Sequence, residues 1–564
     1  MKSTGCIAIV FFAALVLASA EIKNKGWWQH AVFYQVYPKS FMDSNSDGIG
    51  DLKGIQEKLQ HFVDIGITGI WLSPINKSPD KDNGYDISDF RDIQPAFGTL
   101  QDFENLVKEA KTLGLKVILD LVPNHTSDKH QWFVESEKNN KTYKDYYIWM
   151  DKIPNNWVSV FNGSAWKYNE QRKQYYYHQF YWQQPDLNYD NTAVQNEMKE
   201  IMQFWLDKGL DGFRIDAVPH IYESNINQNE PLLSDDLNET LHASYNHTLT
   251  KDQPKTYDLI KSWREFVDEY ANKKNRDEVV LMTEAYTSLD NTIKYYNFGS
   301  QVPFNFKYIT DANVNSSATN FKNIADNWIS RIPPDDVANW VMGNHDRNRV
   351  SSRYPGRGDQ MIMLEMILPG VAVTYYGEEI GMVDNTDFEF SDFRDGCRTP
   401  MQWNSDAYAG FTKGNKTWLP VHKNYKILNV AAEKNDSNSV YNMYKNLTTL
   451  RKSEILRYGA VDTRVVQDNV LVVRRRYNNE VLALLINFSN DKNYTVDLVD
   501  IMEKKPSEVK LSDTISKVPR TDVDLNAFSI PAKASVVLVG NLANTAGISL
   551  VSVLLAAIVS LYRS

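Results

Sequence analysis

The chain has 564 residues, a formal net charge of −10 at pH 7 and 12% aromatic residues. This length indicates two or three globular domains. An acidic balance without long runs of Lys or Arg argues against nucleic acids and anionic membrane surfaces as partners, so a small neutral ligand is expected.

Residues 1–20 have the pattern of a secretory signal peptide. Lys2 precedes an apolar run at 6–18, and residues 18–20 form an A-x-A cleavage site. The run is shorter than the roughly 20 residues of a membrane span, and an uncleaved anchor is the alternative. Removal of the signal leaves Cys397 as the single cysteine, so no intramolecular disulfide is expected. Sequons of the N-x-S/T type agree with a secretory route, among them Asn140, Asn238, Asn315, Asn446 and Asn487.

A loop rich in Asp and Asn follows the first strand-like run. Its candidate ligands for a metal ion are Asp43, Asn45, Asp47 and Asp51. Oxygen atoms on alternate residues around Gly48 suit a hard divalent cation, so calcium is the favoured interpretation. The loop is no EF-hand, because its twelfth position is Gly54, and a solvated turn is the alternative.

Strand-like and helix-like runs then alternate along the chain. Helix-like runs at 52–62 and 100–113 each precede an apolar strand. Eight parallel strands separated by helices predict a (β/α)8 TIM barrel, with an open doubly wound sheet as the alternative. The eight predicted strands are 30–37, 69–73, 115–122, 210–218, 279–284, 302–306, 339–343 and 371–376.

Two segments do not fit the alternation. Residues 126–209 are too long for a loop and predict an inserted domain B after the third strand. The alternating runs after residue 458 predict a C-terminal antiparallel β domain. The expected division is a signal peptide at 1–20, the barrel in two parts at 21–125 and 210–457, domain B at 126–209, the β domain at 458–543 and a tail at 544–564.

The C-terminal tail is apolar from Ile548 to Tyr562 behind small and polar residues. This order resembles the signal for a glycosylphosphatidylinositol (GPI) anchor, with Asn541 or Asn544 as candidate attachment points. A short C-terminal transmembrane helix is the alternative. Both interpretations place the protein at the outer face of the plasma membrane.

Polar residues gather at the predicted strand ends, where barrel enzymes carry their active sites. Arg214 and Asp216 lie two apart in the strand GFRID, so both side chains should face the same side. Carboxylates from several strand ends with two histidines, and without an HExxH motif, fit glycosidic chemistry better than metal-dependent hydrolysis. The strand-end residues are Asp120, Asn124, His125, Arg214, Asp216, Glu284, His345 and Asp346, with Tyr85 and Asp86 after the second strand.

Six short motifs carry a resemblance to a known family. DLVPNH, GFRIDAVPH, TEAY and GNHD occur in the order of the four signature regions of glycoside hydrolase family thirteen, the α-amylase family. QPDLN at 184–188 and RTPMQW at 398–403 are similar to motifs of its oligo-1,6-glucosidase and insect maltase branch. The resemblance covers 27–543, and with the predicted signal and anchor it is greatest to the membrane-anchored α-glucosidases of the insect midgut.

The resemblance implies a role for each matching residue. It implies Asp216 as the nucleophile, Glu284 as the acid/base and Asp346 as the carboxylate that stabilises the transition state. It also implies that Asp86 and Arg398 pair to close the pocket, which makes the enzyme exo-acting. The implied substrate-binding residues are Tyr85, Asp86, His125, Arg214, His345 and Arg398, and the implied calcium ligands are Asp43, Asn45, Asp47, Ile49 and Asp51.

The resemblance implies maltose, sucrose and short oligosaccharides as substrates, and the residues fit a retaining double displacement. A nucleophile and an acid about 5 Å apart leave no room for water between nucleophile and sugar. Arg214 is expected to keep Asp216 ionised, and Glu284 is expected to stay protonated after its apolar strand.

Three other functions remain open at this stage. The heavy chains of amino-acid transporters resemble the same family, but they begin with a cytosolic tail and commonly lack the catalytic set. An anchored enzyme could also be a docking surface or receptor for another protein, such as a bacterial toxin. Transfer of glucose to a second sugar would use the same site as hydrolysis, and the oligomeric state, including a homodimer, is open.

Overall fold

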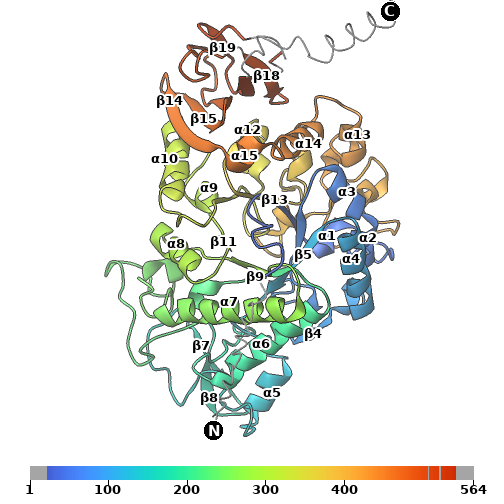
Figure 1. Ribbon diagram of the computed structural model, residues 1–564. Helices are drawn as coiled ribbons and strands as arrows, with labels where there is room; N and C mark the ends of the chain where they lie inside the picture. Colours follow the sequence, from blue (N-terminus) through green and yellow to red (C-terminus); the bar gives the residue numbers. More distant parts are fainter. Residues whose placement is uncertain (1–21, 506, 517, 520–522, 541–564) are drawn as a thin grey trace, which may run out of the picture.

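Eight parallel strands form the centre of this computed structural model, which describes residues 22–505, 507–516, 518–519 and 523–540 (Figure 1). Every pairing between them is parallel, and the order β11-β10-β9-β5-β2-β1-β13-β12 follows the chain around a barrel. The predicted (β/α)8 class is therefore confirmed. The strands are β1 (Val32–Val36), β2 (Gly69–Leu72), β5 (Lys116–Leu121), β9 (Gly212–Ile215), β10 (Val280–Thr283), β11 (Val302–Pro303), β12 (Asn339–Val341) and β13 (Val371–Tyr375).

Alternate side chains of these strands face the inside of the barrel or the helices around it. Phe33, Trp71 and Ile118 pack together in the inner cluster. In β9, Phe213 and Ile215 belong instead to the large outer core. Arg214 between them therefore faces inward.

A side chain bridges the seam between β11 and β12. Asn339 Nδ2 donates to the carbonyl of Pro303 at 2.6 Å, and its Oδ1 accepts the backbone N–H of Asn305 at 2.8 Å. Asn339 also donates to the hydroxyl of Tyr296 at 3.2 Å. The shortest strand of the barrel is thus held by an amide side chain.

Helices cover the outside of the barrel (Figure 1). α4 shows why these segments are helical: Thr99 caps it in a capping box with Asp102, and its apolar face is buried. The longer helices are α2 (Leu52–Glu57), α3 (Leu59–Asp64), α4 (Leu100–Thr112), α6 (Thr192–Asp207), α7 (Pro254–Lys274), α8 (Leu289–Asn297), α10 (Ala318–Ile329), α12 (Gly358–Ile367) and α14 (Val440–Leu450). Shorter ones are α1 (Pro38–Phe41), α9 (Lys307–Thr310), α11 (Val350–Arg353), α13 (Val430–Lys434) and α15 (Glu454–Tyr458).

The segment after β5 builds a small aromatic-rich layer. It contains α5 (Gln131–Glu137) and a three-stranded antiparallel sheet in the order β6-β8-β7. Trp157, Trp166 and Tyr177 form its own buried cluster. The strands are β6 (Trp149–Met150), β7 (Trp166–Asn169) and β8 (Gln174–Tyr177), and a two-stranded sheet after β2 pairs β3 (Asn76–Lys77) with β4 (Asp89–Ile93).

The C-terminal strands form two antiparallel sheets, as predicted. They pack beside α10, α12 and α15 (Figure 1). Arg475 is buried there and donates to the carbonyls of Ile367, Leu456 and Gly459. The sheets are β14-β15-β16-β20-β18 and β17-β19, from β14 (Ala460–Val466), β15 (Val470–Tyr477), β16 (Glu480–Asn487), β17 (Tyr494–Val496), β18 (Ser507–Ser512), β19 (Phe528–Ile530) and β20 (Ser535–Gly540).

Three expectations from the sequence concern the processing of the chain: the signal peptide, the membrane anchor and the glycosylation sites. The signal peptide at 1–20, the tail at 544–564 and the candidate anchor residues Asn541 and Asn544 lie outside the described residues. None of the helices within the described ranges combines the length and apolarity of a membrane span. Asn487 is buried and its amide donates to three backbone carbonyls, so its side chain is not accessible for glycosylation in the folded protein.

Candidate active site

The carboxyl ends of the barrel strands enclose one small pocket. Asp216, Glu284 and Asp346 line it together, although they follow three different strands. The space measures about 210 Å³, below the roughly 300–1,000 Å³ of sites for drug-sized ligands, which suits a ligand as small as one sugar unit. The lining residues are Asp82, Tyr85, His125, Phe161, Phe180, Asp216, Ala217, Glu284, Tyr286, His345, Asp346, Arg347, Phe393 and Arg394.

One guanidinium links the carboxylates on the β5, β9 and β10 side of the pocket. Arg214 Nη1 lies 2.9 Å from Asp120 Oδ1 and 2.5 Å from Asp216 Oδ1. Its Nη2 lies 3.2 Å from Glu284 Oε1. The contact with Asp216 confirms that the two side chains face the same way. It also brings Asp216 and Glu284 within the reach of one arginine.

This sharing changes the expected charge of Asp216. Burial and the facing charge of Glu284 raise the pKa of Asp216, and Arg214 opposes them only in part. The pKa of Asp216 is thus shifted upward, opposite to the direction expected from Arg214 alone. The physical reason is that a single cation serves Asp120 and Glu284 as well. Burial likewise raises the pKa of Asp120 to about 7.

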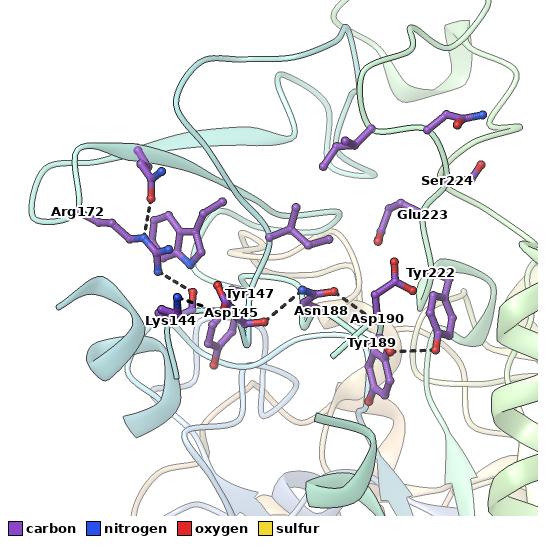
Figure 2. Close-up of a pocket in the computed structure, with 15 residues that line it drawn as sticks. Lys144, Asp145, Tyr147, Arg172, Asn188, Tyr189, Asp190, Tyr222, Glu223 and Ser224 are labelled. Carbon is purple, nitrogen blue, oxygen red and sulfur yellow. Dashed lines mark hydrogen bonds and ion pairs between the residues drawn. The ribbon is translucent and has the colours of Figure 1, made fainter. Parts of the chain in front are cut away.

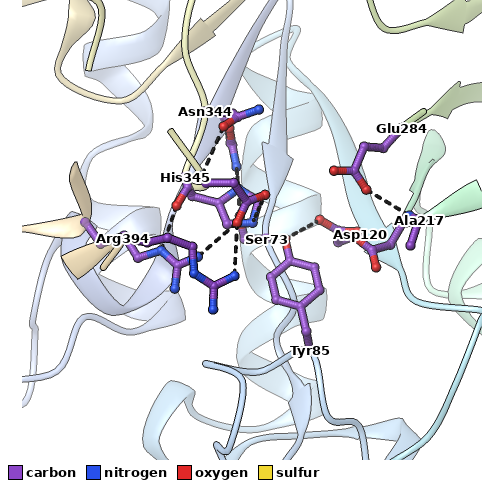
Figure 3. Close-up of polar contacts among 12 residues, drawn as sticks. Ser73, Tyr85, Asp120, Ala217, Glu284, Asn344, His345 and Arg394 are labelled. Carbon is purple, nitrogen blue, oxygen red and sulfur yellow. Dashed lines mark hydrogen bonds and ion pairs between the residues drawn. The ribbon is translucent and has the colours of Figure 1, made fainter. Parts of the chain in front are cut away.

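The backbone beside the pocket positions Glu284. Ala217 follows Asp216 with a φ of 47°, in the left-handed region that residues with a Cβ rarely adopt. This conformation directs its N–H to Glu284 Oε2, at 2.8 Å (Figure 3). The backbone N–H of Val218 donates to the carbonyl of Glu284 at 3.2 Å. The backbone of the turn after β9 therefore donates hydrogen bonds to Glu284, and side-chain motifs do not reveal these contacts.

Asp346 has a different electrostatic environment on the opposite wall. Its Oδ1 accepts from Arg394 at 3.2 Å and from Arg398 at 3.1 Å. Burial alone would raise the pKa of Asp346, but the charges of His345, Arg394 and Arg398 hold it below its ordinary value. Because burial lowers the pKa of His345 to about 3, that ring is neutral at pH 7 and the two arginines carry the effect. Asp346 is therefore a fixed negative charge.

Tyr85 and two histidines form the floor of the pocket. The rings of Tyr85 and His345 are stacked, with centroids 5.2 Å apart. The Tyr85 hydroxyl donates to Asp120 at 3.1 Å (Figure 3). His125 is fully buried, and burial lowers its pKa to about 4. All three predicted residues are in the pocket wall.

The predicted pairing of Asp86 with Arg398 is wrong. Asp86 accepts from Ser78 and from two backbone N–H groups of its own loop, and it does not line the pocket. The carboxylate that reaches the pocket is Asp82, whose Oδ1 accepts from Arg394 Nη2 at 2.7 Å. The side chain of Asp86 points back into its own loop, where it accepts the backbone N–H groups of Lys81 and Asp82. Arg398 instead donates to Asp346 and to the His345 carbonyl.

Sequence reasoning also missed the aromatic wall and the second arginine. The rings of Phe161, Phe180, Tyr286 and Phe393 line the pocket, and Phe393 is 71% exposed. The only sequence signal for the first two was the aromatic richness of the inserted segment. Arg394 lies four residues before Arg398, the first residue of the RTPMQW motif.

The loop at 43–51 contains the predicted calcium ligands in a tight turn. Asp43 Oδ1 accepts the N–H groups of Asn45 and Ser46, and Asp51 caps α2 through the N–H of Gly54. Among the described residues, no three His, Cys, Asp or Glu side chains are arranged to hold a metal ion. The predicted set also includes an amide and the Ile49 carbonyl, and its all-oxygen chemistry suits Ca²⁺.

A second cavity of about 420 Å³ lies between the inserted segment and the chain after β9 (Figure 2). Lys144, Arg172 and Asn188 line one part, and Tyr222 and Glu223 line another. None of the predicted site residues lines this cavity. The three carboxylates predicted from the sequence to be catalytic therefore line only the smaller of these two spaces.

Comparison with known proteins agrees with this geometry. Residues 35–459 match the family model described as "Alpha amylase, catalytic domain". The chain is 46% identical to Maltase 1 of Drosophila virilis, covering 87% of this chain and 86% of that protein, and 43% identical to the salivary alpha-glucosidase of Aedes aegypti, covering 91% and 95%. The crystal structure of the alpha-glucosyl transfer enzyme XgtA superposes with a TM-score of 0.81 at 32% identity, covering 91% and 99%.

Proposed function

The chain belongs to the α-amylase family and is a glycoside hydrolase of the α-glucosidase kind, and from this premise we propose that it releases α-glucose from the non-reducing end of short α-glucosides with retention of configuration. The observation that supports the proposal is the meeting of Asp216, Glu284 and Asp346 around one pocket. Maltose, sucrose and short oligosaccharides are the proposed substrates.

The first step of the proposed reaction forms a glucosyl ester. Asp216 attacks the anomeric carbon as Glu284 gives its proton to the leaving oxygen, so one C–O bond forms and one breaks. Asp216 and Glu284 both touch Arg214, which fits the short separation that this mechanism needs. This step requires the proton of the pair to be on Glu284 when the substrate binds.

The second step releases the sugar. Glu284, now a carboxylate, takes a proton from water, and the oxygen of that water displaces Asp216 from the anomeric carbon. Asp346 stays negative because Arg394 and Arg398 hold its pKa low, so it can accept hydrogen bonds from sugar hydroxyls. It also stabilises the positive charge that develops on the ring.

The proposal includes an exo mode of action, which the ion pairs on one wall of the pocket support. Asp82, Arg394 and Asp346 form a continuous set of ion pairs across that wall. A sugar seated there can present only a chain end. Gln184, from the QPDLN motif, supports the wall by donating to Asp82 at 3.0 Å.

The proposal is tested by following the anomer that is released first. Proton NMR of p-nitrophenyl α-glucoside hydrolysis, in which the transferred glucose is the only sugar released, should show α-glucose before mutarotation, and initial release of β-glucose would disprove retention. Asp216→Asn should reduce turnover to background with an unchanged melting temperature and retained maltose binding. A near-normal rate in that variant would refute the assignment of the nucleophile.

Transfer of glucose to a second sugar is a further candidate, because the glucosyl ester reacts equally with water or a hydroxyl. The structural likeness to an alpha-glucosyl transfer enzyme favours it. Product analysis at high maltose concentration separates the two: oligosaccharides longer than maltose indicate transfer, and glucose alone excludes it.

Secretion and attachment to the membrane through a GPI anchor complete the proposal. Its support is the signal-like sequence at 1–20, the anchor-like tail at 544–564 and the similarity to a protein named a salivary alpha-glucosidase. Phosphatidylinositol-specific phospholipase C should release the enzyme from intact cells if the anchor is present. A docking role for another protein, such as a toxin, would persist in Asp216→Asn, and light scattering would show whether the chain forms a homodimer.

The loop ligands Asp43, Asn45, Asp47, Ile49 and Asp51 are proposed to hold a structural Ca²⁺. The support is their all-oxygen chemistry on alternate residues of one turn. Saturating calcium should raise the melting temperature relative to chelator by about 2 °C, since a hundredfold excess over Kd contributes about 2.7 kcal/mol. Asp47→Ala should remove the difference.

A further inference from the structure

The cavity on the leaving-group side of the catalytic pocket carries an excess of positive charge. It measures about 410 Å³ and shares the lining residues Tyr286 and Arg347 with the catalytic pocket, so the two spaces adjoin at these side chains. The other residues that line it are Lys251, Ala285, Thr287, Ser288, Thr292, Phe304, Phe306, Lys307, Thr310, Asp311 and Trp328.

Its position identifies which part of a substrate would occupy it. The lining segment 285–288 follows Glu284 directly. Under the proposed function, on which this inference rests, Glu284 gives its proton to the departing oxygen. The cavity adjoins the pocket at Tyr286, two residues after this acid, and is therefore the space that we assign to the group attached to that oxygen.

Three cations face this space against one carboxylate of the lining. Lys307 Nζ lies 3.5 Å from Asp311 and 3.5 Å from the Thr287 carbonyl. Within the described ranges, neither Lys251 nor Arg347 has a carboxylate within the 4.0 Å of a salt bridge. Of the three, Arg347 extends over the ring of Tyr286, with 5.4 Å to its centroid.

Of these three cations, Lys251 is the one that an anionic ligand would stabilise most. Its side chain is half-buried, and burial together with the charge of Lys307 lowers its pKa, while Asp252 opposes this. The carboxylate of Asp252 accepts a hydrogen bond from the hydroxyl of Thr287 instead. A partly desolvated ammonium close to a second cation gains more from an anionic partner than a solvated one does.

The catalytic pocket has the opposite charge. Four carboxylates line it, those of Asp82, Asp216, Glu284 and Asp346, against two arginines. A neutral glucose suits that pocket, and a negative group suits the cavity next to it. Such a division of charge favours ligands with one neutral and one anionic end.

We propose that this cavity, lined by Lys251, Lys307 and Arg347, is an aglycone site that selects α-glucosides whose leaving group carries a carboxylate or a phosphate. The neutral glucose occupies the carboxylate pocket, and the anionic end of the leaving group lies beside the lysines. The enzyme therefore acts on acidic α-glucosides faster than on neutral ones of the same shape.

Maltobionate and maltitol test this proposal directly. Both carry glucose on the same open-chain polyol, and they differ only in a terminal carboxylate against a terminal hydroxymethyl group. In wild-type enzyme at low salt, kcat/KM should be about tenfold higher for maltobionate, and 0.5 M NaCl should reduce the difference only in part, because partly buried charges are screened less than exposed ones. Equal values for the two substrates would overturn the proposal.

Lys251→Gln isolates the contribution of the cavity. It should reduce the ratio of kcat/KM for maltobionate to kcat/KM for maltitol to about twofold or less. Lys261→Gln, an exposed lysine of α7, removes the same charge elsewhere and should change neither value. An unchanged preference in Lys251→Gln would contradict the proposal.

Failure of the proposed function would be recognised separately. If maltose is hydrolysed normally but the preference for maltobionate is absent, only the aglycone site is wrong. If no glucoside is hydrolysed, titration calorimetry of maltobionate and maltitol into wild type and Lys251→Gln decides the inference alone. Tighter binding of maltobionate that depends on Lys251 supports it, and equal affinities overturn it.

Discussion

The neighbours of Asp346 and Asp216 shift the pKa values of these two carboxyl groups in opposite directions. Asp346 has two arginines close to its Oδ1 and stays ionised, whereas Asp216 shares one arginine with two other carboxyls. Two carboxyls that share a proton are the usual way in which a site supplies both an acid and a nucleophile. The division of labour between Asp216 and Glu284 thus depends on Arg214.

Glu284→Gln distinguishes an acid/base from a nucleophile. The variant cannot protonate a leaving sugar, so kcat/KM for maltose should fall about 10²- to 10⁴-fold. p-Nitrophenolate leaves without a proton, and the first step on p-nitrophenyl α-glucoside should lose far less in a burst measurement. Equal losses with both substrates would remove the acid role from Glu284.

Asp82 and Asp86 provide a matched pair of neighbouring aspartates. Asp82→Asn weakens the ion pair with Arg394, and kcat/KM for maltose should fall about tenfold to a hundredfold, because hydrogen bonds to charged groups are worth about 1.5–3 kcal/mol. Asp86→Asn should mainly lower the melting temperature, since its partners belong to its own loop. The reverse pattern would restore the sequence-based pairing of Asp86 with the pocket.

The elements of the barrel could be predicted more fully than the site could. All eight strands fall within runs identified from the sequence, because buried parallel strands are continuously apolar. The seam at Asn339 and the donor at Ala217 could not be predicted, because an amide in a strand and an alanine after an aspartate have no distinctive pattern. The side chains of Asp82 and Asp86 differ in direction only through the turn between them, which one sequence does not specify.

The N-terminal cap of α5 gives a pH dependence at the scale of one element. His130 Nδ1 accepts the N–H of Trp132, and burial lowers the pKa of His130 to about 3. Below pH 6.5 the unfolded chain binds a proton at this histidine that the folded chain does not, so stability falls as the pH falls. The loss is at most about 1.4 kcal/mol per pH unit, and it continues toward the folded pKa.

His130→Asn should remove that dependence and keep the cap, because Asn is a favoured N-cap residue. In urea unfolding from pH 7 to pH 4.5, the free energy of unfolding of the variant should fall less than that of the wild type as the pH falls. Parallel curves for the two proteins would show that His130 is protonated in the folded state.

At the scale of the whole molecule, the barrel and the C-terminal sheets are joined through buried arginines. Arg475 binds the carbonyls of Ile367 and Leu456 in the barrel helices α12 and α15 and that of Gly459 just after α15. Arg357, which precedes α12, donates to the carbonyls of Asn487 and Phe488. Because the C-terminal strands contribute none of the residues that line the pocket, the domain supports the barrel rather than the chemistry.

Arg475→Leu should separate the unfolding of the C-terminal sheets from that of the barrel. Buried carbonyls left unpaired cost about 1–3 kcal/mol each, so calorimetry should show an earlier transition of the β domain. Activity at 25 °C should be retained. Arg476→Leu, whose side chain is 46% exposed, is the matched control and should leave a wild-type melting curve. An unchanged curve for Arg475→Leu would mean that the arginine does not couple the domains.

The central claim is that distant carboxylates meet at one glucose ring with Asp216 as the attacking group. Incubation with 5-fluoro-α-D-glucosyl fluoride, followed by proteolysis and mass spectrometry, tests it most directly. The account predicts a stable fluoroglucosyl adduct on the peptide that contains Asp216, absent from Asp216→Asn. An adduct on another residue, or a maltose-hydrolysing enzyme that never acquires one, would contradict it.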